Sequence, residues 1–199
     1  MLCLEGSVRC FGDETPRERI KYEENRSDCK KTKERRDFPN RGVMRVVLVD
    51  TYRKEQIDEK IYDLQEELAT KKAYLASYFE SGGEDRYFLV AVSGNNILGT
   101  MEFGKQSALL KELTKGELKE VPEMGTAFVH PDHQGQGIAS TLLEELKREM
   151  RRRGISEFCL DSGYQRAQRI WKKQFGSPRY TFENYWAEGV SHEIWIVKI

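Results

Sequence analysis

The strongest constraint on the fold of this 199-residue chain is one strand–loop–helix segment, residues 121–150. Residues 121–129, VPEMGTAFV, form a short apolar run of the kind found in buried strands. Apolar side chains then recur at helical spacing, at Ile138, Leu142, Leu143, Leu146 and Met150. Gly154 ends this helix, and residues 155–161 read as the next strand. The two strands are therefore predicted to be parallel, with the helix crossing over between them.

The loop inside this segment, HPDHQGQG at residues 130–137, has the composition of an anion-binding turn. Gly135 and Gly137 let the backbone bend so that successive N–H groups converge, and the following helix adds the positive end of its dipole. Such a turn suits a pyrophosphate. An isolated Gly-x-Gly pair more often serves packing alone, so the prediction depends on the flanking strand and helix.

In this context the segment resembles the GNAT acyl-CoA N-acyltransferases, whose signature is Arg/Gln-x-x-Gly-x-Gly/Ala. Gln134, Gly137 and Ala139 match that signature. The resemblance extends over about residues 45–199. It implies a fold of the α+β or α/β class, with a central mixed, mostly antiparallel sheet of about six to seven strands flanked by helices. In that fold the parallel strands 121–129 and 155–161 splay apart.

The resemblance also implies acetyl-CoA as the acyl donor, with its pantetheine arm in the gap between the splayed strands. Main-chain groups near Phe128 and Val129 would pair with the arm as another strand does, and one N–H would polarise the thioester carbonyl. The cofactor contacts implied are Phe128, Val129, Gln134, Gly135, Gln136, Gly137, Ile138, Ala139, Ser140 and Trp171. No metal site is expected.

Acyl transfer to an amine needs a group that accepts the amine's proton. Glu123 lies 134 − 123 = 11 residues before Gln134, the interval at which some GNAT members carry a glutamate base. Glu123 is therefore the candidate base, and the competing interpretation is an ordinary polar residue at the solvent edge of the strand. His130 and His133 are alternative bases by residue type. Their place beside Pro131 and the loop favours a turn-stabilising role.

The departing thiolate needs a proton, and here the sequence departs from the family pattern. Many members carry Asn-x-x-Ala-x-x-x-Tyr after this unit; counted from Ala167, this chain has Tyr164 in the asparagine place and Trp171 in the tyrosine place. An indole N–H is not acidic enough for this role, so we expect Trp171 to pack against the cofactor or core. Tyr164 is a candidate acid, and Tyr185, Cys159 and water are open alternatives.

The function predicted is an N-acetyltransferase that moves the acetyl group of acetyl-CoA to a primary amine of a small molecule, peptide or protein by direct attack. The missing tyrosine supports an alternative, a non-catalytic GNAT-like domain that binds acyl-CoA for regulation or assembly. The sequence does not identify the acceptor. Several aromatic side chains could line its pocket, although core packing is the commoner use at these spacings: Tyr52, Tyr74, Tyr78, Tyr180, Tyr185 and Trp186.

Composition argues against several classes of partner. Lys and Arg, 33 in all, balance 33 Asp and Glu, so no net charge attracts nucleic acid or an anionic membrane. No stretch approaches the roughly 20 apolar residues of a membrane span, and no signal peptide is expected. Small molecules are the expected partners and the cytoplasm the expected location, with oligomeric state, a homodimer included, left open. The cysteines are expected to be reduced thiols: Cys3, Cys10, Cys29 and Cys159.

Two regions are predicted: a charged N-terminal arm, residues 1–43, and the GNAT domain, residues 44–199. The arm holds eleven Lys/Arg and nine Asp/Glu with few large apolar side chains, so it cannot bury much surface by itself. Its basic run, residues 30–36, could contact nucleic acid, but the interspersed acids favour a solvated arm. Irregular spacing argues against a metal site at its cysteines.

The remaining elements follow from hydrophobic periodicity and turn residues. We expect strands at 43–49, 87–92, 97–103, 180–186 and 192–199, a long helix or helix pair over 53–79, a hairpin turn at 93–96, a charged excursion at 105–119 and a helix over 166–175.

Overall fold

The computed structural model describes residues 21–23, 42–57, 59–93 and 96–199. Most of the predicted arm lies outside the described residues, including its basic run at 30–36 and Cys3, Cys10 and Cys29. The centre of the hairpin turn predicted at 93–96 also lies outside them.

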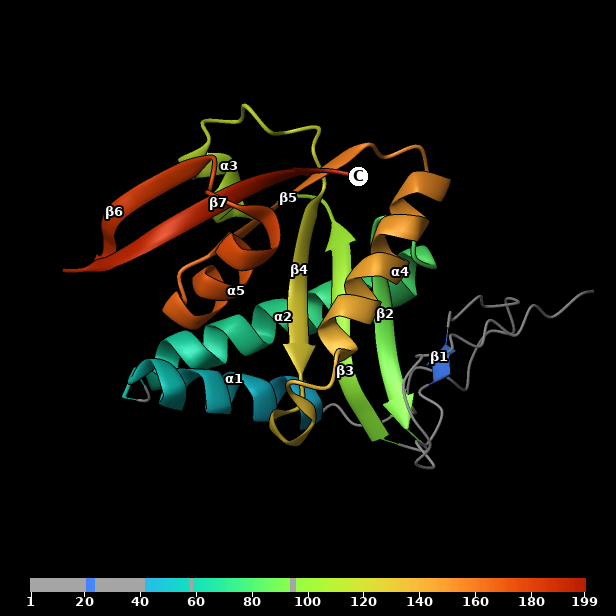
Figure 1. Ribbon diagram of the computed structural model, residues 1–199, viewed down its shortest axis with the longest axis horizontal. Helices are drawn as coiled ribbons and strands as arrows, with labels where there is room; N and C mark the ends of the chain where they lie inside the picture. The colour runs from blue at the N-terminus through green and yellow to red at the C-terminus, as the bar shows by residue number, and fades with distance from the viewer. Residues whose placement is uncertain (1–20, 24–41, 58, 94–95) are drawn as a thin grey trace, which may run out of the picture.

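A mixed sheet in the order β1-β2-β3-β4-β5-β7-β6 forms the middle layer of the described structure (Figure 1). Its strands are β1 Lys21–Glu23, β2 Arg86–Ser93, β3 Asn96–Gly104, β4 Glu123–Val129, β5 Glu157–Ser162, β6 Tyr180–Ala187 and β7 Val190–Lys198. Neighbouring strands are antiparallel except β4 and β5, which are parallel. This confirms the predicted sheet and its one parallel pair.

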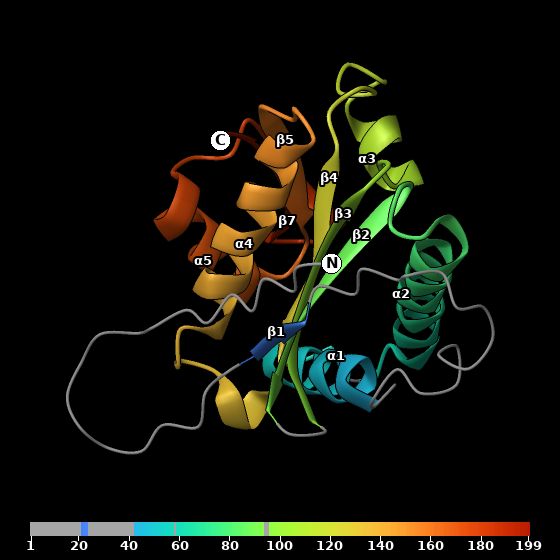
Figure 2. The ribbon, with the colours of Figure 1, turned by 90° about the vertical axis from the view of Figure 1, so that its right-hand side faces the viewer.

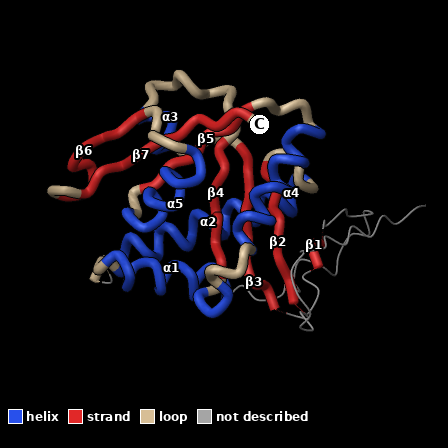
Figure 3. Tube along the Cα trace, in the orientation of Figure 1, coloured by secondary structure: helices blue, strands red, loops and turns tan. Residues whose placement is uncertain are grey.

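Helices cover both faces of the sheet. They are α1 Gly42–Glu55, α2 Ile61–Ser81, α3 Ala108–Leu113, α4 Ile138–Arg152 and α5 Gln165–Phe175, with a 3-10 turn, η1, at Pro131–His133. α4 and α5 lie on one face, while α2 and α3 lie on the other (Figure 2). The alternation of strand and helix along the trace from β4 to α5 is the crossover unit that the sequence predicts (Figure 3).

The strand predicted at residues 43–49 is wrong, because this segment forms the first half of α1. Four of its apolar residues, Val43, Met44, Val47 and Leu48, lie on the buried side of a helix with at most 4% of their surface exposed, while Val46 and Val49 are exposed. Consecutive valines favour a strand by local preference, and packing against α2 and the sheet overrides that preference here. The predicted helix at 53–79 divides into the end of α1 and most of α2, and Gly82 ends α2 in a left-handed conformation.

The main core joins the sheet to α4 on one face and to α1 and α2 on the other (Figure 2). Leu142, Leu146 and Met150 of α4 are fully buried there, so the periodicity in the sequence does mark the buried face of this helix. At the end of α4, the Glu149 carboxylate accepts hydrogen bonds from Arg152 and Arg153, and Arg153 also donates to the Gly83 carbonyl at 2.9 Å. Arg153 therefore holds the end of α4 against the end of α2.

Candidate active site

The parallel strands β4 and β5 separate soon after they meet. Within the described residues they pair at a single position, Glu123 opposite Cys159, and the Cys159 N–H donates to the Pro122 carbonyl at 2.9 Å. Beyond this point β4 continues to Val129 with β3 on one side and no strand paired on the other. The predicted splay is therefore present, and Glu123 lies at its closed end.

A β-bulge bends β4 just past Glu123. One residue of β3 lies between Thr100 and Glu102, while two residues of β4 lie between their partners Phe128 and Gly125, and Thr126 takes up the extra residue with φ 47°. The Thr100 hydroxyl donates to the Thr126 carbonyl at 2.9 Å. Because a bulge increases local bend and twist, it directs the second half of β4 away from β5.

The main chain of β4 offers an N–H group to this gap. The His130 N–H donates to the Leu98 carbonyl of the β3 segment at 2.7 Å, and hydrogen-bonding direction alternates along a strand. Phe128 therefore turns its main chain toward β3, and Val129 turns its N–H toward the gap. Of the two residues named from the sequence, Val129 is the one whose amide can reach a ligand there, and the role of Phe128 stays a prediction.

The loop after β4 presents main-chain donors to solvent. Gly135 and Gly137 have φ 75° and 83°, and the residues from Gln134 to Gly137 are exposed. α4 begins at Ile138 with Gly137 as its N-cap, and no side chain caps it. The first N–H groups of a helix have no acceptor within it, so the amides of residues 138–140 are available to an anion.

Gln134 fixes the start of this loop. Its side-chain amide donates to the Val129 carbonyl at 3.2 Å, and its oxygen accepts from Lys54 of α1 at 3.2 Å. The Gln136 side chain donates back to the Asp132 carbonyl at 3.3 Å. Both glutamines stabilise the loop through side-chain hydrogen bonds to main-chain carbonyl groups. The N–H groups of Gly135 and Gly137 take no part in these bonds.

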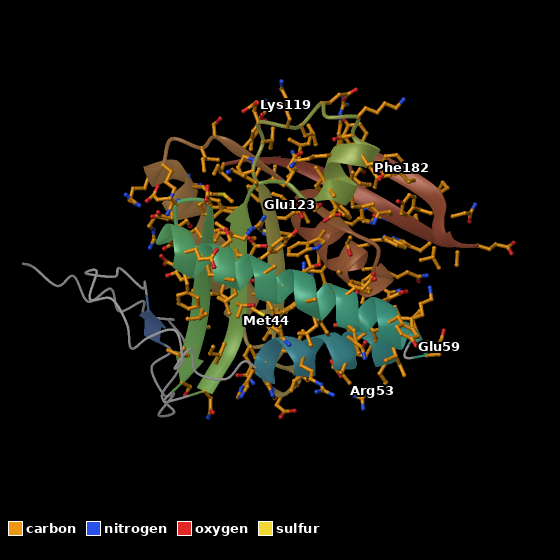
Figure 4. All side chains as sticks on the ribbon, turned by 180° about the vertical axis from the view of Figure 1, so that it is seen from behind. Met44, Arg53, Glu59, Lys119, Glu123 and Phe182 are labelled. Atoms are coloured by element: carbon orange, nitrogen blue, oxygen red, sulfur yellow. The ribbon has the colours of Figure 1, made fainter. Side chains whose placement is uncertain are left out.

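Glu123 is buried, with 6% of its surface exposed, and lies between α2 and α3 in the view onto the α2 face (Figure 4). Its carboxylate accepts a hydrogen bond from the Ser107 N–H at the start of α3. Burial, reinforced by the negative charge of Asp161, raises the pKa of Glu123 to about 7, and the Ser107 bond opposes this rise. A carboxyl with a pKa near neutral can accept a proton from an amine, and the role of Glu123 as a base stays a prediction.

Tyr164 is tied to the opposite wall of the gap. Its hydroxyl bonds to the Glu67 carboxylate of α2, and Tyr52 of α1 donates to the same carboxylate at 3.4 Å. Burial, followed by the charge of Glu67, raises the pKa of Tyr164. Glu55 of α1 also accepts the first two N–H groups of α5, so this cluster joins the two halves of the domain. The hydroxyl has a structural partner and is not free as a proton donor.

Trp171 packs as predicted. Its ring stacks on Phe175 with centroids 5.7 Å apart, and it borders the main core. Cys159 is fully buried beneath α3, and burial raises the pKa of its thiol to about 12, which argues against it as an acid. His130 accepts the Asp132 N–H through Nδ1 and caps η1, in line with a turn-stabilising role.

The sequence did not predict roles for Asp161, Ser107 or His192. The fold places Asp161 and Ser107 near Glu123, and His192 next to Asp161. His192 lies 2.9 Å from Asp161, and their strands β7 and β5 are adjacent although 31 residues separate the two in the chain. The aromatic residues suggested for the acceptor pocket differ in their exposure. Tyr52 and Tyr78 are buried, while Tyr185 and Trp186 on β6 are 39% and 47% exposed. A hollow of about 440 Å³ lies along α1 and Pro131, and Glu123 is not among the residues that line it.

The model of the acetyltransferase (GNAT) family matches residues 48–176, which include the gap, the loop and Glu123. The chain belongs to this family. No curated protein matches the GNAT chain closely enough for comparison. Among the described residues, none of the helices is long and apolar enough to cross a membrane.

Solved structures similar to this GNAT chain share its fold. The PaiA N-acetyltransferase of Thermoplasma acidophilum, in complex with coenzyme A, is 17% identical with a TM-score of 0.60, covering 90% of this chain and 99% of its own. A GNAT-family protein of Desulfovibrio desulfuricans is 16% identical with a TM-score of 0.55, over 67% of this chain and 81% of its own. The ribosomal-protein-alanine N-acetyltransferase of Brucella melitensis is 18% identical with a TM-score of 0.50, over 66% and 78%.

Proposed function

We propose that this GNAT domain transfers the acetyl group of acetyl-CoA to a primary amine by direct attack. One observation carries the proposal: an uncapped helix N-terminus and an open sheet gap lead to a buried glutamate at the gap's closed end. The similar Thermoplasma structure was determined in complex with coenzyme A, which supports this choice of donor.

The chain has the groups to hold the donor. The exposed amides of residues 135–140 would bind the pyrophosphate, because the glycines leave its approach open and the helix dipole favours negative charge. The Val129 N–H would pair with the pantetheine arm or polarise the thioester carbonyl. When bound, acetyl-CoA supplies the activated acetyl group, and the chain supplies alignment and a base.

Glu123 accepts one proton from the acceptor's ammonium group, directly or through water. The freed nitrogen lone pair attacks the thioester carbon, and a C–N bond forms. As the C–S bond breaks, the nitrogen releases its second proton to water. Charge that develops on the carbonyl oxygen is stabilised by the main-chain N–H groups of the gap. The coenzyme A thiolate leaves and takes its proton from water, since the Tyr164 hydroxyl is bonded to Glu67 and the indole N–H of Trp171 is not acidic enough to supply one.

The same placement of Tyr164 and Trp171 favours the second candidate, an acyl-CoA-binding domain without turnover. One experiment separates the two. Calorimetry measures binding of coenzyme A, and thiol release from acetyl-CoA is followed with a panel of small amines, peptides with a free N-terminus and lysine-containing peptides. Binding with amine-dependent release supports the acetyltransferase, binding without release for any amine supports the second candidate, and absence of binding contradicts both.

A further inference from the structure

Three side chains from three adjacent strands form a hydrogen-bonded series next to Glu123. The Trp186 indole of β6 donates to His192 Nδ1 of β7 at 3.1 Å, and His192 Nε2 lies 2.9 Å from Asp161 Oδ2 of β5. His192 is only 2% exposed. The series therefore runs from an exposed ring on β6, through a buried imidazole, to a carboxylate near the candidate base.

The chemistry of the indole fixes the direction of these bonds. An indole N–H can only donate, so Nδ1 of His192 accepts and carries no proton. The ring's proton is therefore on Nε2, from which it is donated to the Asp161 carboxylate. His192 thus acts as a neutral donor that holds one oxygen of Asp161 in place.

Gly163 makes room for this arrangement. A Cβ placed on Gly163 would lie 2.3 Å from the Trp186 Nε1 atom, so the indole rests directly on the glycine backbone. The ring centroid of Tyr185 lies 4.9 Å from that of Trp186 in an edge-on contact. Trp186 is therefore held in one orientation while 47% of its surface stays exposed.

Asp161 and Glu123 share one face of the sheet. Asp161 follows Cys159 by two residues on β5, which places both side chains on the same face, and Cys159 is the position opposite Glu123. The Asp161 side chain is 19% exposed, and no hydrogen bond to its Oδ1 atom is found among the described residues. Its second oxygen is thus available to a cation that approaches Glu123.

We propose that Asp161 binds the ammonium group of the acceptor beside Glu123, and that His192 and Trp186 are positioning residues that orient the Asp161 carboxylate. This inference rests on the proposed acetyl transfer. Two carboxylates in unlike surroundings suit different tasks: the buried Glu123 accepts the proton, and the partly exposed Asp161, held by an N–H donor, carries the charge that attracts the amine. The ammonium loses its proton only after it is held next to the base.

Other groups also face Glu123 and act on its protonation. They are Asp161 and Cys159 of β5, Glu102 of β3, Lys71 and Tyr74 of α2, and the Ser107 N–H before α3. Around His192 lie Asp161, Trp186 and Tyr185. Asp161→Asn changes one charge in this set and keeps the shape of the side chain.

The test is steady-state kinetics of Asp161→Asn over pH 5.5–9, together with calorimetry of coenzyme A binding. We expect the KM for the amine to rise about tenfold or more, because a charge-assisted contact is lost, while the affinity for coenzyme A is unchanged. We also expect the acid limb of kcat/KM to move to lower pH, since loss of a neighbouring negative charge favours ionised Glu123. Glu183→Gln, which removes an exposed carboxylate from β6, is the charge-matched control and should leave both values unchanged.

The positioning residues have their own test. Trp186→Phe keeps a ring and removes the indole N–H, so we expect the KM for the amine to rise several-fold, about half an order of magnitude. Tyr62→Phe, at a ring of α2 that is 83% exposed, is the control and should leave KM unchanged. Nitrogen chemical shifts of the His192 imidazole, assigned by their loss in His192→Gln, should show the Nε2–H tautomer in the wild type.

The outcomes separate this inference from the proposed function. If the wild type is active but Asp161→Asn shifts neither the KM for the amine nor the acid limb, the inference alone is overturned. An Nδ1–H tautomer of His192 also overturns it, and that measurement stands even if Asp161→Asn does not fold. A wild-type chain that binds coenzyme A but releases no thiol with any amine overturns both.

Discussion

The Ser107 N–H donates to the Glu123 carboxylate, so the residue that caps α3 also orients the candidate base. Ser107 accepts the Leu110 N–H through its own hydroxyl, which fixes the start of α3 over this site. The charged excursion that precedes β4 in the sequence therefore covers the base and removes it from bulk water. That burial is the main reason its pKa is raised to about 7.

Glu123→Gln should lower kcat/KM at pH 7 by about a hundredfold or more, because a positioned general base contributes on this scale. The amide keeps the acceptor for the Ser107 N–H but cannot take a proton. Wild-type activity should rise with pH through an acid limb near 7, and the variant should lose that limb while it binds coenzyme A normally. A variant with the wild-type pH profile would remove Glu123 from the mechanism.

The same substitution should stabilise the folded chain at alkaline pH. The folded-state pKa of Glu123, about 7, lies above its ordinary value of 4.5, so the wild type loses stability as pH rises between these values. The difference corresponds to about 3 kcal/mol at pH 8, and Glu123→Gln should regain most of it. Denaturant unfolding at pH 4 and pH 8 checks this: a gain at pH 8 and none at pH 4 is expected, with the exposed Glu112→Gln as a control that changes neither.

Gly137→Val should weaken coenzyme A binding at least tenfold in calorimetry, because φ 83° is unfavourable for valine and relaxation of the loop would disperse its amides. A Cβ at this position meets no protein atom within 4 Å, so the effect comes from backbone conformation. Gly116→Val is the matched control, with φ 75° and equally open surroundings. Gly116→Val should lower the free energy of unfolding by a similar amount and leave the affinity for coenzyme A unchanged. Equal affinities for the two variants would contradict the predicted pyrophosphate site in the loop.

The loop that contains Gly135 and Gly137, and helix α1, show which features can be predicted from the sequence and which cannot. Glycines at 135 and 137, between an apolar run and a helical repeat, predict the loop correctly because all of its determinants are adjacent in the chain. Residues 43–49 were misassigned because a valine-rich run is locally compatible with a strand, and the packing that makes it helical comes from α2 and the sheet. Local preference is a poor guide where distant contacts decide.

The parts of the site that the sequence did not predict depend on side chains brought together from distant positions. Asp161, Trp186 and His192 meet only because β5, β7 and β6 are neighbours in the sheet. The bulge at Thr126 has no local signal, since threonine is an ordinary strand residue and its positive φ is imposed by the ladder with β3. The order and pairing of the strands must be known before the side-chain cluster or the bulge can be inferred.

Arg86→Met should destabilise the fold by about 3–5 kcal/mol, because it leaves Glu102 buried without its cation. Arg86 lies 2.5 Å from the fully buried Glu102 carboxylate and stacks on the Tyr74 ring, 3.7 Å from its centroid. Lys105→Met breaks an exposed ion pair with Asp85 and should cost about 0–1 kcal/mol. Denaturant unfolding of both variants measures the contrast, and adding Glu102→Gln to Arg86→Met should restore part of the loss.

Tyr164→Phe should reduce stability by about 1–3 kcal/mol and change kcat by less than about threefold. The Tyr164 hydroxyl bonds to the Glu67 carboxylate, so its removal leaves a partly buried charge without one hydrogen-bond donor. The reaction should be little affected, because this hydroxyl is not expected to supply a proton to the thiolate. Tyr62→Phe, at a side chain that is 83% exposed, is the control for loss of a hydroxyl without a partner. A fall in kcat of about a hundredfold with unchanged stability would instead make Tyr164 the acid.

Truncation tests the boundary of the GNAT domain, which we place at the start of α1. A chain that begins at Arg41 keeps all of α1, whereas one that begins at Met44 loses Val43, a core side chain only 3% exposed. Burial of a valine is worth about 1.5 kcal/mol, so the shorter chain should be less stable by about that amount although both should fold. Thermal and denaturant unfolding of the two chains decides this; equal stability would show that the first turn of α1 contributes nothing, and the boundary at residue 44 would then hold.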